Sequence, residues 1–289
     1  MLNIVIGLFP ALMWGILPIL LTKIGGQPIH QMVGTTLGAL AVAIVIFCFT
    51  YSQVHFTWLV VLLCFVSGLF WSIGQINQYR AFNMIGVSQT MPLSTGLNLI
   101  SNSLFGVIVF GEWATTTKLI LGFSAICVII IGVSFTSYQQ ERSNKEAKKF
   151  KKGIWILLLS TIGYVGYATL PNFTHANGWT TFLPQVSGMV VGTFIHALFE
   201  PKERNILQRE SWLNLVSGMV FSLGALGYLI SLQSNGVAIG YTLSQMGVVL
   251  STIGGILFLH EKKNHKETLF MIMGLVLICI GGVLIGLTK

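Results

Sequence analysis

The chain has 289 residues, of which 54% are hydrophobic and 8% are charged, and it contains no Asp. Because an ordinary soluble domain carries about 25% charged residues, this composition excludes a soluble globular protein and predicts an integral membrane protein. The formal net charge of +8 does not indicate nucleic-acid binding, since the basic residues lie in short loops between apolar runs and not on one soluble face.

Ten apolar runs follow one another along the chain, each close to the roughly 20 residues that a helix needs to cross a bilayer. They cover residues 2–22, 29–50, 57–79, 89–110, 115–137, 153–173, 179–199, 212–232, 237–259 and 267–287. Their length and the lack of period-2 alternation exclude an outer-membrane barrel. The first run has neither a basic n-region nor a small-residue cleavage site, so we expect a retained helix. The pattern predicts an all-α integral membrane protein with ten transmembrane helices.

Basic residues are distributed unequally over the loops. The loops after the first, third, fifth, seventh and ninth runs carry 14 Lys and Arg residues, whereas the opposite side carries only Lys118 and Lys289. By the positive-inside rule, both termini are expected outside the cytoplasm and the 138–152 loop inside.

An internal repeat is visible around this loop, which separates a first half (1–137) from a second half (153–289). "SGLFWSIG" at 67 matches "SGMVFSLG" at 217, and the same offset of 150 gives 9 identities in 35 positions. A second echo, displaced by 154, pairs Gln31-x-x-Gly34-x-x-x-Gly38 with Gln185-x-x-Gly188-x-x-x-Gly192. Because each half has an odd number of spans, the second copy enters the membrane upside down. Two inverted five-helix repeats of this kind are typical of secondary transporters, whose site lies near the midplane where the repeats meet.

Polar side chains interrupt the apolar spans of both halves. Trp71, Gln75 and Gln78 recur at i, i+4 and i+7, which is one face of a helix. Ser94, Asn98, Ser101 and Asn102 form a similar stripe on the next span. Such groups usually face the bundle interior or a cavity. The candidate substrate-binding residues are therefore Trp14, Gln31, Trp71, Gln75, Asn77, Gln78, Asn98, Tyr164, Tyr167, Gln185 and Gln245.

The absence of an acid from the middle of every span indicates the substrate class. A pathway for cations is expected to keep a carboxylate, and one for organic anions or amino acids a buried cation or broken-helix N-termini. A neutral molecule covered with hydroxyl groups needs amides, hydroxyls and aromatic faces instead, because an unpaired hydroxyl costs about 1–3 kcal/mol. A sugar fits this set. The alternative is that Gln75, Asn77 and Gln78 hold helices together.

Three ionisable residues near span ends are open to two interpretations. Glu112 and Glu261 are expected to serve helix ends, with proton coupling at Glu112 as the alternative. His196 could carry protons because an imidazole titrates near neutrality, or it packs near the cytoplasmic end. The four cysteines (Cys48, Cys64, Cys127 and Cys279) are scattered singly and have no metal or disulfide spacing, so we expect them to pack between helices.

Several motifs together resemble one known family. These are "PALMWG" at 10–15, "GQINQ" at 74–78, "MPLSTGLNL" at 91–99, "GEW" at 111–113, "TIGYVGY" at 161–167, "QVSGM" at 185–189 and "STIGGI" at 251–256. The chain resembles the bacterial glucose/ribose uptake permeases, a ten-span branch of the drug/metabolite transporter superfamily. The position of Asn98 is Gln in similar proteins. The resemblance implies sugar import across the bacterial plasma membrane, generally coupled to protons.

The sequence thus predicts a secondary transporter that imports glucose or a similar monosaccharide by alternating access, with H⁺ as coupling ion and no other cofactor. The expected partners are the sugar and the lipid bilayer, without nucleic acid; oligomeric state is open. No G-x-x-x-x-G-K-[ST] loop or catalytic arrangement is present. The alternatives are an exporter of amino acids or small metabolites, a sugar uniporter, and a membrane scaffold or receptor, which would not require amides in both halves.

Overall fold

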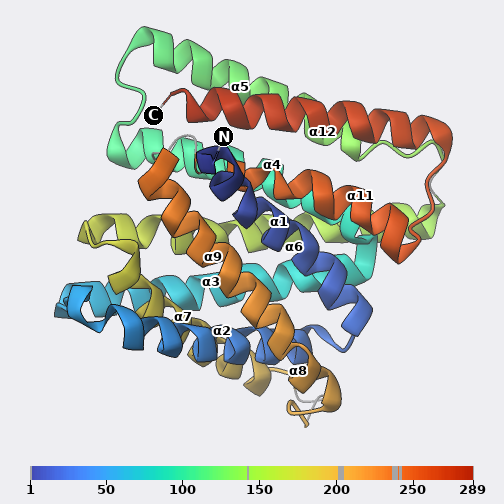
Figure 1. Cartoon of the computed structure of the whole chain (residues 1–289). Coiled ribbons are helices and arrows are strands. Elements are labelled where there is room, and N and C mark those ends of the chain that lie inside the picture. Colours follow the sequence, from blue (N-terminus) through green and yellow to red (C-terminus); the bar gives the residue numbers. More distant parts are fainter. Residues whose placement is uncertain (1, 142, 201–204, 236–239, 241–242, 289) are drawn as a thin grey trace.

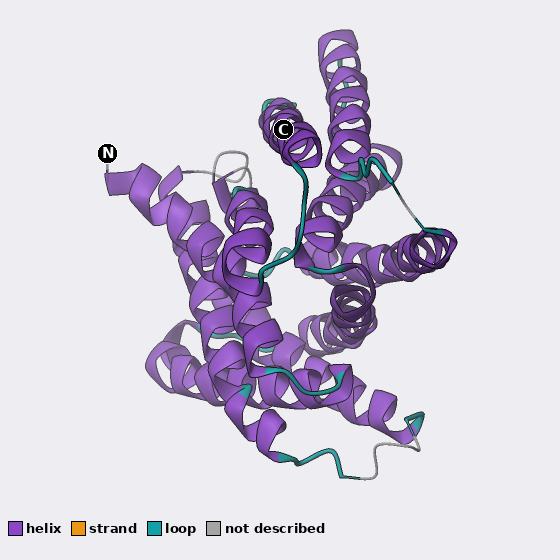
Figure 2. Ribbon diagram, turned by 90° about the vertical axis from the view of Figure 1, so that its right-hand side faces the viewer, coloured by secondary structure: helices purple, strands orange, loops and turns teal. Residues whose placement is uncertain are grey.

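A computed structural model describes residues 2–141, 143–200, 205–235, 240 and 243–288, and these residues form helices and no strand (Figures 1 and 2). The first half contains α1 (Leu2–Ile24), α2 (Pro28–Thr50), η1 (Tyr51–Gln53), α3 (Trp58–Ile85), α4 (Val87–Phe110) and α5 (Thr116–Thr136). The second half contains α6 (Asn144–Thr169), η2 (Leu170–Thr174), α7 (Gly178–Leu198), α8 (Arg209–Leu213), α9 (Leu215–Asn235), α11 (Gly247–Leu259) and α12 (His265–Gly286).

The described residues confirm a multi-helix membrane protein. They include nine helical segments that are long and apolar enough to cross a bilayer, and a shorter apolar helix at Leu243–Leu259. That shorter helix falls on the ninth predicted run, 237–259, of which residues 237–239, 241 and 242 lie outside the described part of the chain. Each of the other predicted runs coincides with one of the nine segments.

The largest difference from the predicted boundaries concerns the polar insert at 138–152. We expected a linker there, but α6 already begins at Asn144. A capping box starts the helix: the Ser143 hydroxyl accepts from the Glu146 N–H (3.3 Å), and the Glu146 carboxylate accepts from the Ser143 N–H (2.9 Å). This pairing satisfies two backbone donors that a helix start leaves without partners. Much of the insert is therefore a helical extension of the sixth span.

The helices run back and forth between two ends of the bundle. One end carries the loops after α1, α3, α5, α7 and α11, and 14 Lys and Arg residues lie in or next to these loops in the sequence. We call it the basic end. In Figure 1 the loops after α1, α3, α5 and α11 lie toward the right, whereas α7 ends near the bottom of the view. Both α5 and α12 lie side by side along one edge of the bundle, packed mainly against each other.

Helices of one half pack chiefly against helices of the other. The closest pairs join α3 to α6 and α7, and α1 and α2 to α9. Glycines make the close approach possible, because a Cβ on Gly38 would clash with the Leu215 carbonyl and one on Gly188 with the Phe65 carbonyl. The main apolar core lies between these helices and includes Trp71 and Phe221.

The glycine contacts of the two halves match one another at an offset of 150. Gly218 lies against Thr35 and Ala39, as Gly68 lies against Gln185 and Met189. Likewise, Gly38 contacts Gly218 and Gly188 contacts Gly68. The contacts therefore pair Gly38 with Gly188, whereas the sequence echo displaced by 154 had paired it with Gly192.

Candidate functional site

Three helices bring four neutral polar side chains into one hydrogen-bonded group, which we call the amide network: Gln75 and Gln78 on α3, Ser94 on α4 and Tyr164 on α6. The Tyr164 hydroxyl lies 2.7 Å from Gln75 Oε1 and 2.8 Å from Gln78 Oε1, and its single proton donates to one of them at a time. Gln75 Nε2 donates to Gln78 Oε1 (3.2 Å), and Gln78 Nε2 donates to the Ser94 hydroxyl (2.8 Å).

The network lies inside the bundle and contains no charged group. Gln75 is 6% exposed and Ser94 2%, while the ring of Tyr164 packs against the main apolar core. Each member can both donate and accept a hydrogen bond. The group can therefore exchange its internal bonds for bonds to the hydroxyls of a neutral ligand without uncovering a buried charge.

Aromatic rings from α1, α3 and α9 pack in the same apolar core as Tyr164 of the network. Trp71 is almost fully buried, and its ring lies 5.1 Å from that of Phe221. The indole of Trp14 donates its Nε1 hydrogen to the Phe221 carbonyl (3.2 Å), and its ring lies 5.7 Å from Tyr228. The predicted Trp14 and Trp71 thus lie against the same residue of the other half. Phe221 and Tyr228 were not predicted, although Phe221 aligns with Trp71 in the repeat.

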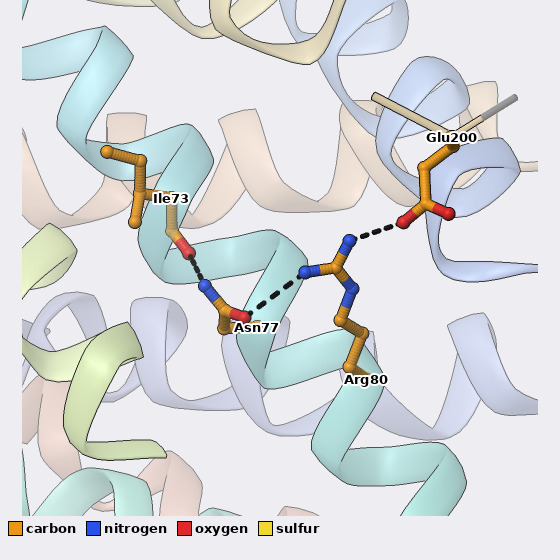
Figure 3. Close-up of polar contacts among 4 residues, drawn as sticks. All are labelled: Ile73, Asn77, Arg80 and Glu200. Atoms are coloured by element: carbon orange, nitrogen blue, oxygen red, sulfur yellow. Dashed lines mark hydrogen bonds and ion pairs between the residues drawn. The ribbon is translucent and has the colours of Figure 1, made fainter. Parts of the chain in front are cut away.

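Asn77 lies on α3 but does not join the network. Its Nδ2 donates to the Ile73 carbonyl (2.8 Å), and its Oδ1 accepts from Arg80 (3.4 Å), which also forms an ion pair with Glu200 just beyond α7 (Figure 3). Both polar atoms of Asn77 therefore have protein partners. This arrangement favours a structural role for Asn77, since it helps to orient the Arg80 guanidinium toward the end of α7.

Two further predicted residues, Gln31 and Gln185, also bond to the protein itself. Gln31 Nε2 donates to the carbonyls of Leu21 (3.1 Å) and Gly25 (3.4 Å) at the end of α1. Gln185 Nε2 donates to the Ser67 hydroxyl (2.9 Å), joining α7 to α3. The structure brings neither of them into the amide network, and their contacts favour helix packing.

The remaining candidates lie on three helices. Tyr167 packs against the main core, and its carbonyl accepts from the Ser67 hydroxyl (2.8 Å), near the Gln185 contact. Gln245, at the start of the short apolar helix Leu243–Leu259, has one long contact to the Ser244 hydroxyl (3.4 Å). Asn98 lies on α4 one helical turn beyond Ser94, on the same face.

The two acids near span ends have different surroundings. The Glu261 carboxylate accepts from the N–H groups of Val87 (2.6 Å) and Ser88 (3.0 Å), so it caps the N-terminus of α4 from the loop after α11. Gly86 makes room for it: its φ is +79°, and a Cβ there would meet the carboxylate. The expected helix-end role of Glu261 agrees with this geometry.

The predicted proton-coupling residues lie outside the amide network. Glu112 follows the far end of α4, where its carboxylate lies beside Gly106. His196 lies in the last turn of α7, near the basic end and one turn before Glu200. Within the described ranges, no three His, Cys, Asp or Glu side chains are grouped so as to hold a metal ion.

A groove of about 1050 Å³ between α1, α9 and α11 has a different chemistry. Its lining consists of apolar side chains and one glycine: Val5, Ile6, Leu8, Phe9, Ala11, Leu12, Leu223, Leu226, Gly227, Ile230, Met246, Val249 and Leu250. No side chain there can pair a hydroxyl group. The groove suits lipid tails better than a sugar.

Comparisons with known proteins agree with this chemistry. A model of the family described as "Sugar transport protein" matches residues 5–288. The chain is 51% identical to a protein of Listeria monocytogenes named for sugar uptake, over 99% of both chains. It is 44% identical to a protein of Priestia megaterium named for glucose uptake, over 99% of both chains, and 41% identical to one of Latilactobacillus sakei named for ribose uptake, over 97% and 96%. A crystal structure with 16% identity has a TM-score of 0.65 and covers 99% of this chain and 97% of its own, which shows a shared fold.

Proposed function

The chain belongs to the sugar transport protein family, a family of transporters and not of enzymes, and on that premise we propose that it imports glucose or a similar neutral monosaccharide as a secondary transporter. The amide network is the observation that carries this proposal. Its two glutamines, one serine and one tyrosine offer donors and acceptors in a buried, uncharged place. These are the groups that replace the water a sugar loses on leaving solution.

The matched glycine contacts support two inverted repeats and transport by alternating access. The offset of 150 also relates Trp14, which lies against Gly224, to Tyr164, which lies against Gly74. Equivalent positions of the two halves therefore make equivalent contacts with the opposite half. In inverted-repeat transporters such an arrangement allows the two ends of the pathway to open in turn.

The proposed orientation follows the charge distribution. The basic end is placed in the cytoplasm and the termini outside a bacterial plasma membrane, since cytoplasmic loops carry the excess of Lys and Arg. Sugar would then enter from the end that carries the termini.

Proton coupling is proposed with Glu112 or His196 as the titrating group, in keeping with the expected uptake against a gradient. Sugar uniport is the second candidate. The amide network consists of two glutamines, one serine and one tyrosine, and neither Glu112 nor His196 belongs to it.

Purified protein in proteoliposomes tests these proposals. We expect uptake of labelled glucose, with accumulation above equilibrium when the lumen is more alkaline than the outside. Equilibration that ignores the pH gradient would identify a uniporter. If glucose and other monosaccharides neither enter nor exchange, the proposed function is wrong.

A further inference from the structure

Two asparagines on α4 hold buried oxygen atoms that have no hydrogen-bond partner among the described residues. Asn102 Nδ2 donates to the Asn98 carbonyl (2.9 Å). Only the NH₂ group of an asparagine side chain can donate to a carbonyl, so this bond fixes the orientation of the Asn102 amide. Oδ1 of Asn102 and Oδ1 of Asn98 are the unpaired atoms.

Unpaired acceptors of this kind are unfavourable inside a membrane protein. Most buried polar side-chain atoms have a partner, and each exception calls for a cause. In hydrocarbon no solvent replaces a missing partner. Two such oxygens one turn apart therefore indicate donors that the described residues do not supply.

Their position connects them to the amide network. Ser94, Asn98 and Asn102 follow at intervals of four residues, so they lie along one face of α4. Ser94 receives a hydrogen bond from Gln78, which places the start of this face beside the network. Asn98 also lies at the middle of α4 (Val87–Phe110). The unpaired oxygens are thus near mid-membrane, where a transporter of this design holds its substrate.

We propose that Asn98 and Asn102 form an acceptor subsite for two neighbouring ring hydroxyls of the sugar. Residues four apart on a helix have Cβ atoms about 5–6 Å apart, a spacing at which two adjacent hydroxyls can each donate to one oxygen. The inference rests on the proposed function and adds a chemical requirement to it: the sugar must carry a vicinal diol whose hydroxyls act as donors. The amide network can then contact other hydroxyls of the same ring.

Replacement by leucine separates binding from folding. Asn98→Leu and Asn102→Leu remove the unpaired oxygen at similar volume, so the ligand-free protein is expected to melt at the same or a higher temperature. The matched control is Thr136→Val, which removes a buried hydroxyl from α5, where it donates to the Val133 carbonyl of the same helix. A Cβ on Gly274 would meet Thr136, so this residue lies at the contact between α5 and α12 and not on the Asn98 face of α4.

The probes are glucose and its single-deoxy analogues, measured by thermal stabilisation and by counterflow with full-length protein. Each Leu variant should bind glucose about 5- to 150-fold more weakly than the native protein, whereas Thr136→Val should bind it normally. The deoxy analogue that lacks the relevant hydroxyl should lose affinity in the native protein but not in the matching variant, because the two changes remove one interaction.

Unchanged glucose affinity in both Leu variants would overturn the subsite. An equal loss of affinity for every deoxy analogue in native and variant protein would overturn it as well. Neither result would contradict sugar transport itself. If a Leu variant does not fold, Asn98→Ala and Asn102→Ala remove the acceptor without adding apolar bulk, and the same affinity loss is expected. A native protein that responds to no sugar would instead refute the proposed function itself.

Discussion

Replacing Gln78 by Leu tests whether the amide network binds substrate or only joins helices. Within the network Gln78 Oε1 accepts from Gln75 and lies within hydrogen-bond distance of the Tyr164 hydroxyl, and Gln78 Nε2 donates to Ser94, so two of these three contacts join helices. Gln78 Nε2 also lies 3.8 Å from the Met91 sulfur on α4. Interhelical hydrogen bonds in membranes contribute about 0.6 kcal/mol on average. The substitution should therefore lower the free energy of unfolding by about 1–2 kcal/mol. If Gln78 also pairs a sugar hydroxyl, glucose affinity should fall by about 1–3 kcal/mol, or 5- to 150-fold.

The two effects are measured on the same purified protein, as the unfolding midpoint without sugar and the glucose concentration that gives half-maximal stabilisation. Gln185→Leu is the control, since Gln185 also bonds across helices, to Ser67, but lies outside the network. It should lower stability while glucose affinity remains unchanged. If Gln78→Leu behaves like this control, the network only holds helices together and the placement of the site on α3 is refuted.

Other substitutions test the ends of the helices. Glu261→Ala should lower the free energy of unfolding by about 0.5–2 kcal/mol, because the α4 N-terminus loses its cap; a melting curve unchanged from the native one would contradict this. Glu112→Gln should leave glucose counterflow intact and abolish uptake driven by a pH gradient if Glu112 carries the proton, whereas equal loss of both activities would indicate a structural role. In a cysteine-free background, a single cysteine at Ser143 should resist an impermeant thiol reagent applied to intact cells, and one at Thr288 should react; labelling at Ser143 would reverse the proposed topology.

The spans could be predicted because a bilayer imposes a length on every crossing, and apolar runs report that length directly. The boundary at α6 could have been found as well, since "SNKE" at 143–146 is a capping box followed by strong helix formers. The lysines of this segment indicated a loop because they are charged, although lysine also has a high helix propensity. In the repeat, chance matches between glycine-rich helices obscured the register, and only the contacts of Gly38 and Gly188 paired them.

The candidate site was harder to predict. The spacing of residues along a helix shows which of them share a face of that helix, but not which residues of other helices they contact. The spacing of Gln75 and Gln78 placed them together, and Tyr164 proved to be their partner from another helix. The same reasoning could not distinguish Gln31 from the network glutamines, although Gln31 bonds to a backbone carbonyl at the end of α1. Which amide meets a backbone group and which meets another side chain depends on how helices cross, and a single sequence does not contain that information.

The packing of each half against the other also affects how the protein is made. During synthesis the first five helices enter the membrane before α7 and α9 exist, so Gly38 and Gly68 initially face lipid where the finished protein has helix backbone. The contacts of Gly38 and Gly68 with helix backbone therefore form only after α9 and α7 have been inserted, so the packing of the first half is completed by the second.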